Sequence, residues 1–185
     1  MKKITTIAAA VIVATLSSTA MAGEWFAGIE GGKAYNKAEI KEIVSDDKAK
    51  SKFYGVRAGK YLDDNIRVYG TLSKNKFKEI NDNAGGKFIK NQKSLMLSSD
   101  YVFMEDSSIR PFVGGSLGAT RVGIAGKSTT GLAYGAQAGV MFQAGPVDME
   151  IGAKYIGNNA KVKKDGMQAK LKNSRQAYLS ASYRF

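Results

Sequence analysis

SRQAYLSASYRF, residues 174–185, decides the fold class of this 185-residue chain. From position 177 onward its odd-numbered residues are apolar, and its even-numbered residues are serine, arginine or tyrosine. Successive side chains of a β-strand point to opposite faces, so this period of two predicts a strand with one apolar face. The same alternation recurs in seven earlier segments: 24–35, 52–61, 66–73, 94–103, 109–119, 131–142 and 147–155. We therefore predict an all-β chain of eight strands.

The connections between these segments alternate in length. Three are short (62–65, 104–108 and 143–146) and four are long (36–51, 74–93, 120–130 and 156–173). Short turns at one end and long loops at the other are typical of an eight-stranded antiparallel up-and-down transmembrane β-barrel. An even number of strands also brings both ends of the barrel domain to the short-turn end.

The apolar face is predicted to face lipid, because its aromatic side chains gather near both strand ends. Trp and Tyr prefer the two membrane–water interfaces, which produces one aromatic belt at each. The expected belts are Trp25, Tyr101, Phe103, Phe142, Tyr183 and Phe185 at the short turns, and Tyr35, Tyr54, Tyr134 and Tyr155 at the long loops. Apart from the strand-end residues that we count with the long loops (33–52, 74–93, 120–130 and 157–175), this face carries one charge, Lys60, which lies beside a short turn and can extend to the interface.

The polar face carries ten charges, five of each sign, which we expect to form a lumen charge network. They are Glu24, Glu30, Arg57, Arg67, Asp100, Arg110, Asp148, Glu150, Lys154 and Arg184. An unpaired buried charge is costly, so a balanced set favours pairing inside a closed lumen. Three groups are predicted: Glu30 with Arg57, Arg67 with Asp100, and Glu24 with Asp148 and Arg184. The alternative is a solvated lumen in which pairing is incidental.

The N-terminal residues predict export. Lys2 and Lys3 precede an uncharged stretch, 4–16, that is too short to span a membrane, and Ala20-Met21-Ala22 follows as a cleavage motif. We expect a signal peptide, 1–22, to be removed between Ala22 and Gly23. The barrel domain is then 23–185.

The amino-acid composition excludes several classes of function. The chain has 28 basic and 16 acidic residues, a net charge of +12, and neither Cys nor His. Thiol nucleophiles, imidazole chemistry and the commonest metal ligands are therefore excluded, and no enzyme activity, metal or cofactor is expected. Export argues against nucleic acid as the partner of the basic charge.

Three further features resemble a known family. Gly55-Val56-Arg57-Ala58-Gly59-Lys60-Tyr61, with the turn and strand that follow, is similar to the second hairpin of small OmpA/OmpX-like barrels. The segment 111–118, PFVGGSLG, is similar to their fifth strand. The terminal Tyr183-Arg184-Phe185 resembles the signal recognised by the barrel-assembly machinery. The resemblance implies an integral protein of the bacterial outer membrane. A closed barrel needs no partner to cover its edges, so we expect a monomer, although the sequence leaves the oligomeric state open.

Two functions stay open. The long loops with their flanking residues hold 20 basic and 7 acidic residues. They favour an envelope-structural or adhesive barrel in contact with outer-membrane lipid and lipopolysaccharide, and with an external polyanion or host surface as a further candidate partner. A simpler explanation is that the lysines only neutralise neighbouring lipid. The alternative function is a small porin-like channel, although eight strands enclose little more than side chains.

Overall fold

The computed structural model describes seven segments of the chain: 24–40, 48–77, 91–104, 107–124, 127–158, 161–164 and 167–185. The predicted signal peptide and its cleavage site, Ala22 and Gly23, lie outside the described residues. Within these segments, no helix is long and apolar enough to cross a membrane.

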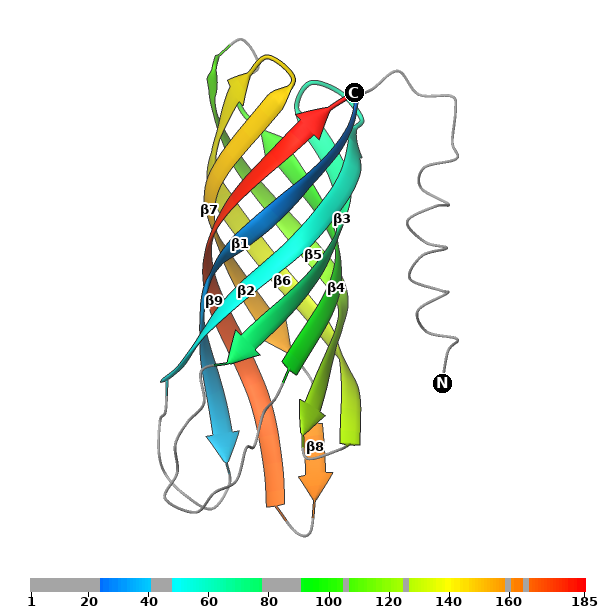
Figure 1. Cartoon of the computed structure of the whole chain (residues 1–185), viewed down its shortest axis with the longest axis vertical. Coiled ribbons are helices and arrows are strands. Elements are labelled where there is room, and N and C mark those ends of the chain that lie inside the picture. Colours follow the sequence, from blue (N-terminus) through cyan, green and yellow to red (C-terminus); the bar gives the residue numbers. More distant parts are fainter. Residues whose placement is uncertain are drawn as a thin grey trace.

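The described segments form one closed antiparallel sheet (Figure 1). Its strands are β1 (Trp25–Ile40), β2 (Lys48–Tyr61), β3 (Ile66–Phe77), β4 (Asn91–Val102), β5 (Ile109–Ile124), β6 (Lys127–Ala144), β7 (Val147–Asn158) and β9 (Met167–Arg184). Each pairs with the next, and β1 pairs with β9 to close the ring. The predicted eight-stranded barrel is confirmed. A short additional strand, β8 (Lys161–Lys164), pairs with β9 beyond the barrel wall.

The strands are longer than predicted at the long-loop end. β1 continues from the expected end at residue 35 to Ile40, and β9 begins at Met167 rather than at 174. Figure 1 shows the C-terminus at the short-turn end and β8 at the opposite end. Much of the sequence that was expected to form long loops therefore extends the barrel wall.

The strands are strongly inclined to the barrel axis. Following paired residues once around the sheet leads from Ser51 of β2 to Tyr61 of the same strand, a displacement of ten residues. Such a stagger over eight strands corresponds to a tilt of about 40°. At about 3.3 Å per residue and this tilt, the ten steps along the strand from Trp25 to Tyr35 rise about 25 Å, the height of an outer-membrane apolar band.

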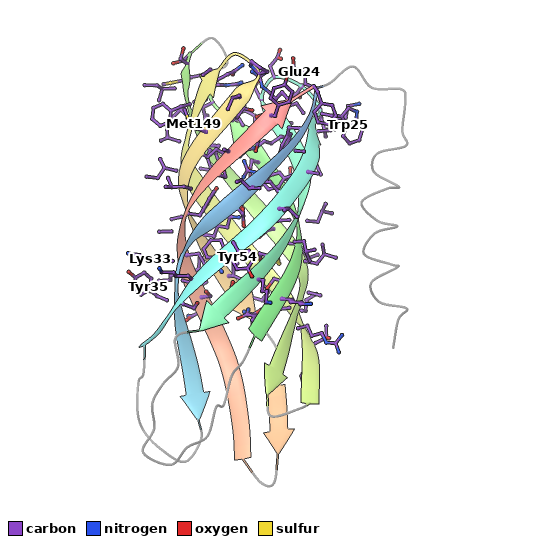
Figure 2. The ribbon with its side chains drawn as sticks, viewed as in Figure 1. Glu24, Trp25, Lys33, Tyr35, Tyr54 and Met149 are labelled. Carbon is purple, nitrogen blue, oxygen red and sulfur yellow. The ribbon has the colours of Figure 1, made fainter. Side chains whose placement is uncertain are left out.

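The two faces are distributed as the alternation predicts. Outward-facing apolar side chains are exposed, including Ile29, Leu97, Leu117, Ile151 and Leu179. Both expected aromatic belts lie on this outer face (Figure 2). The buried core is the lumen, where Phe26, Phe53, Tyr69, Phe112, Met141 and Tyr178 lie. Polarity is thus inverted relative to a soluble barrel.

Local interactions stabilise the turns and the β1–β9 seam at the short-turn end of the barrel. The Asp63 side chain accepts backbone N–H bonds from Asn65 and Ile66 at 2.9 and 2.5 Å, which closes the β2–β3 turn. Gly145 adopts a φ of 59° in the β6–β7 turn, a left-handed conformation that favours glycine. Phe185 and Trp25 exchange two backbone hydrogen bonds of 2.8 and 3.1 Å, so the last residue completes the β1–β9 seam.

Candidate functional site

Glu150 of β7 binds two arginines at the centre of the lumen. Arg57 of β2 donates two hydrogen bonds to its carboxylate, one of them 3.0 Å long. Arg67 of β3 donates a third at 2.5 Å. All three side chains are at most 1% exposed. Because β3 and β7 are four strands apart in either direction around the ring, the Arg67–Glu150 pair spans the lumen along its diameter.

Asp100 of β4 supplies the second negative charge at the centre of the lumen, so that two carboxylates balance the two arginines. Its Oδ2 accepts bonds from Arg67 Nε and Nη2 at 3.0 and 2.7 Å, and from the Tyr69 hydroxyl at 3.0 Å. Gln137 Nε2 donates to its Oδ1 at 2.5 Å and to the Tyr69 hydroxyl at 2.7 Å. The predicted Arg67–Asp100 contact is therefore present in the structure, although sequence reasoning missed the Tyr69 and Gln137 contributions.

Aromatic rings pack around these charges. The Arg67 guanidinium carbon lies 4.9 Å from the Phe112 ring centre, 5.3 Å from Tyr69 and 6.0 Å from Phe26. Arg57 lies 5.2 Å from Tyr69 and 5.9 Å from Phe26. Such distances allow cation–π attraction in addition to ion pairing. We call the set Arg57, Arg67, Asp100, Glu150, Phe26, Tyr69 and Phe112 the lumen plug.

The predicted Glu30–Arg57 ion pair is wrong. Glu30 instead accepts a bond of 2.7 Å from Lys154 Nζ, and Lys154 also lies 4.4 Å from the Tyr178 ring centre. Glu30 is paired in the sheet with Gly55, so it lies diagonal to Arg57 rather than opposite it. The long Arg57 side chain reaches across the narrow lumen to Glu150 instead.

A second ion-paired group lies near the short turns, as expected for Glu24, Asp148 and Arg184. Arg184 Nη1 donates to Glu24 at 2.7 Å, and its Nε lies 3.3 Å from Asp148 Oδ1. Tyr61 donates to Asp148 at 3.0 Å. The Glu24 side chain is 61% exposed whereas the Asp148 side chain is 2% exposed, so the group faces water at Glu24 and is buried at Asp148.

The expected one-to-one pairing of five acids with five bases does not hold for Arg110. Its guanidinium donates to the Gln143 side chain at 3.2 Å and to the Asp64 backbone carbonyl. Among the described residues no carboxylate pairs with it. The balancing acid belongs to the group around Arg184, which holds two carboxylates and one cation.

On the loop side of the plug, one level of the lumen is lined by polar, uncharged side chains. Register places a ring of small or amide side chains there: Ser51, Asn75, Gln92, Thr120, Asn158 and Ser174. All are buried. Asn75 Nδ2, Gln92 Oε1 and both amide atoms of Asn158 make no hydrogen bond to another protein group. This half of the lumen therefore differs in chemistry from the plug.

The outer face carries more charge than predicted. Six basic residues lie on it at the long-loop end: Lys33, Lys52, Lys74, Lys93, Arg121 and Arg175. The longer strands add Lys74, Lys93 and Arg121, and the other three are strand-end residues that were counted with the loops. We call these six residues the basic girdle. Lys60, the outer-face charge expected from the sequence, lies at the other end with its Nζ 5.4 Å from the Trp25 ring centre.

The described residues suggest a structural site rather than a chemical one. Among them, no group of three or more Asp, Glu, Cys or His side chains could hold a metal ion. The described lumen carboxylates accept hydrogen bonds from arginine, lysine, tyrosine and glutamine side chains. None of these contacts places a carboxylate as a general base beside a nucleophile. What this arrangement can do is hold eight strands together and obstruct the lumen.

Comparison with known proteins gives one family and several solved structures. The model of the family described as "Outer membrane protein beta-barrel domain" matches residues 6–185. Neisserial surface protein A is 19% identical, with a TM-score of 0.61 over 87% of this chain and 97% of its own. A search of curated proteins found no significant match.

Two Pseudomonas aeruginosa proteins are also similar in structure. The N-terminal β-barrel domain of OprF is 16% identical, with a TM-score of 0.53 over 89% of this chain and all of its own. Outer membrane protein H (OprH) is 22% identical, with a TM-score of 0.53 over 88% and 99%. At these identities the likeness concerns the fold.

Proposed function

The chain belongs to the outer membrane protein β-barrel domain family and is an integral protein of the bacterial outer membrane, and from this premise we propose that it acts as a closed barrel. In this proposal its lumen does not conduct solutes, and its function lies at its surface. The role is envelope-structural or one of surface interaction, without catalysis.

The observation that carries the proposal is the Arg67–Glu150 ion pair across the lumen diameter. Eight strands enclose an interior just wide enough for side chains. Here that interior holds two arginines, two carboxylates and three aromatic rings at one level. Two positive and two negative charges compensate each other, so the plug has no net charge that would draw ions through it.

Planar bilayer recordings test the proposal against the porin-like alternative. The unmodified protein is expected to show no stable open channel. Replacing Arg57 and Arg67 together with Ser removes both bridging side chains and should produce measurable conductance. Arg110→Ser is the matched control, because Arg110 faces the lumen but contacts neither Glu150 nor Asp100. A stable, solute-permeable channel in the unmodified protein would establish the porin-like function instead.

The proposed role at the cell surface rests on the net positive charge of the long loops. The basic loops favour contact with lipopolysaccharide phosphates and with an external polyanion or host surface. A deletion strain should be tested in parallel for detergent sensitivity and for adhesion. Detergent sensitivity alone supports an envelope role, adhesion loss alone supports a surface-interaction role, and an unchanged strain contradicts both.

We also propose a route of biogenesis from the two predicted signals, the leader and the terminal aromatic motif. Cleavage between Ala22 and Gly23 removes the leader and leaves 23–185 as the barrel domain. The barrel-assembly machinery then recognises Tyr183 and Phe185, which point outward at the seam strand. The closed sheet leaves no free edge in the barrel wall, which supports a monomer.

A further inference from the structure

The uncharged level of the lumen on the loop side of the plug is lined by short side chains. The sheet register places one residue of each barrel strand at this level, and none of the eight is larger than glutamine. Each is at most 3% exposed, so bulk solvent does not reach them. We call this set the polar ring: Ala34, Ser51, Asn75, Gln92, Thr120, Ala133, Asn158 and Ser174.

Three amide side chains of the polar ring carry atoms that make no hydrogen bond to another protein group. Neither Nδ2 nor Oδ1 of Asn158 is bonded, so this group is unpaired whichever way its amide is turned. Asn75 lies four strands away in either direction, and its Nδ2 is also unpaired. Gln92 is the sheet partner of Asn75 and has an unpaired Oε1. A donor and an acceptor therefore lie on paired residues without bonding each other.

The size of the side chains explains why these amides do not meet. Eight strands enclose an interior that long side chains can fill, and arginines and aromatic rings do so at the plug. In the polar ring, five of the eight side chains are alanine, serine or threonine. A buried amide without a partner is costly, and proteins pair the large majority of buried polar atoms with protein groups or with ordered water.

We propose that the polar ring is a binding site for an ordered cluster of water molecules. A buried water makes about three hydrogen bonds to groups that would otherwise stay unpaired. One water can accept from Asn75 Nδ2 and donate to Gln92 Oε1, and others can extend to both amide atoms of Asn158. The ring contains no charged side chain, so it offers neither an anion nor a cation a counter-charge. Its mixture of donors and acceptors matches water, which both donates and accepts.

The cluster gives the loop-side lumen a different kind of cross-link from the plug. The nearest charged residues toward the plug, Glu30 and Lys154, already bond to each other at 2.7 Å and leave the ring to neutral partners. Water between Asn158 of β7 and Asn75 of β3 joins opposite walls, as the Arg67–Glu150 pair joins them in the plug. The inference rests on the closed barrel proposed above, because an open lumen would exchange its water freely.

NMR of the folded, isotope-labelled protein in detergent micelles tests the site through cross-relaxation between water and side-chain amide protons. The Nδ2 protons of Asn75 and Asn158 should show negative NOEs to water, which slowly exchanging water produces. Comparison with rotating-frame transfer separates these NOEs from proton exchange. Gln137 is the matched control, because its buried Nε2 donates to Asp100 and Tyr69 and should show no water NOE. Absence of water NOEs at both asparagines, or an equal signal at Gln137, would overturn the proposal.

Substitution of Asn158 provides a test that depends on the sign of the effect. In a hydrated ring, Asn158→Leu removes two partners of the cluster, so the urea midpoint should fall and the water NOE of Asn75 should weaken. Asn158→Ser keeps a hydroxyl that donates and accepts, and it should retain the Asn75 signal. In a dry ring, leucine would replace an unpaired amide and raise the midpoint, which refutes the site. If the leucine variant does not fold, the NOEs of the unmodified protein still decide.

Glycerol is the probe for a competing occupant, a small hydroxylated solute. It should give no NOE to the amide protons of Asn75 and Asn158. Glycerol NOEs at both residues, with loss of the water signals, would assign the ring to a solute and contradict the proposal. Conductance of the same preparation separates the two proposals. A conducting protein contradicts the closed barrel and the enclosed cluster together, whereas a non-conducting protein without water NOEs contradicts the cluster alone.

Discussion

Replacing Glu150 with Gln should be among the most damaging conservative changes in the barrel. The substitution preserves size but removes the negative charge that both Arg57 and Arg67 contact. Removing one partner of a buried ion pair costs about 3–5 kcal/mol, because the other charge is left uncompensated. Here two arginines would remain with Asp100 as their carboxylate neighbour, so we expect about 4–5 kcal/mol, the upper part of that range.

Urea unfolding in lipid vesicles measures this free energy. The single tryptophan, Trp25, lies beside the barrel seam and reports on its opening. Glu24→Gln is the matched control, because its carboxylate is 61% exposed and exposed pairs contribute about 1 kcal/mol or less. Similar losses for the two variants would show that Glu150 is solvated and that the plug does not exist as described.

A double-mutant cycle makes the test specific to the partner. Arg57→Gln and Glu150→Gln should show a coupling of about 1–3 kcal/mol, because the double variant removes both charges. Arg57→Gln and Glu30→Gln should be additive within about 0.5 kcal/mol, because these side chains do not pair. The reverse pattern would restore the pairing that sequence reasoning suggested and refute the network described above.

Three other predictions concern the seam, the leader and the lumen wall. Deleting Phe185 or replacing it with Lys should lower the yield of folded protein in the membrane fraction, and normal yield of both variants excludes an assembly signal. The intact mass of the purified protein should begin at Gly23; a mass that includes 1–22 shows that the leader is retained. Gly152→Ala should cost about 1–3 kcal/mol, because its Cβ would lie 2.8 Å from the Tyr178 ring. Gly31→Ala, with 3.5 Å to its nearest neighbour, should change stability by less than about 0.5 kcal/mol, and equal losses for the two would contradict this packing.

The direction of each side chain could be predicted from the sequence, because it is a local property. A period of two fixes which residues share a face whatever the strand pairs with. Arg57, Arg67 and Glu150 could therefore be assigned to the lumen before any partner was known. The inverted polarity followed from the aromatic belts on the apolar face.

The partners inside the lumen could not be predicted in the same way, because they depend on the whole ring. Glu150 is three strands from Arg57 and four from Arg67, and their meeting depends on the ten-residue stagger of the closed sheet. Adjacent strands place Glu30 and Arg57 on the same face at similar depth, which favours a pairing that the structure does not contain. Nor does alternation distinguish Tyr69 and Gln137, which complete the Asp100 site, from other inward residues.

Strand ends were missed for a related reason. Where the wall reaches the headgroup level, outward positions change from apolar to basic, as at Lys74, Lys93 and Arg121, which lie just outside the predicted segments. This change removes the apolar alternation, although the backbone pairing continues to Lys37 and Lys48. Residues that resemble loop in the sequence thus became part of the lipid-facing surface.

Whether Glu150 bridges two arginines across the lumen is tested most directly by solid-state NMR of the unmodified, isotope-labelled protein in bilayers. The experiment correlates the Glu150 carboxyl carbon with arginine guanidinium carbons. The structure predicts strong cross-peaks to both Arg57 and Arg67, and none between the Glu30 carboxyl and Arg57. A Glu150 carboxyl without an arginine cross-peak, or a Glu30–Arg57 cross-peak in its place, would contradict the closed, charge-paired lumen.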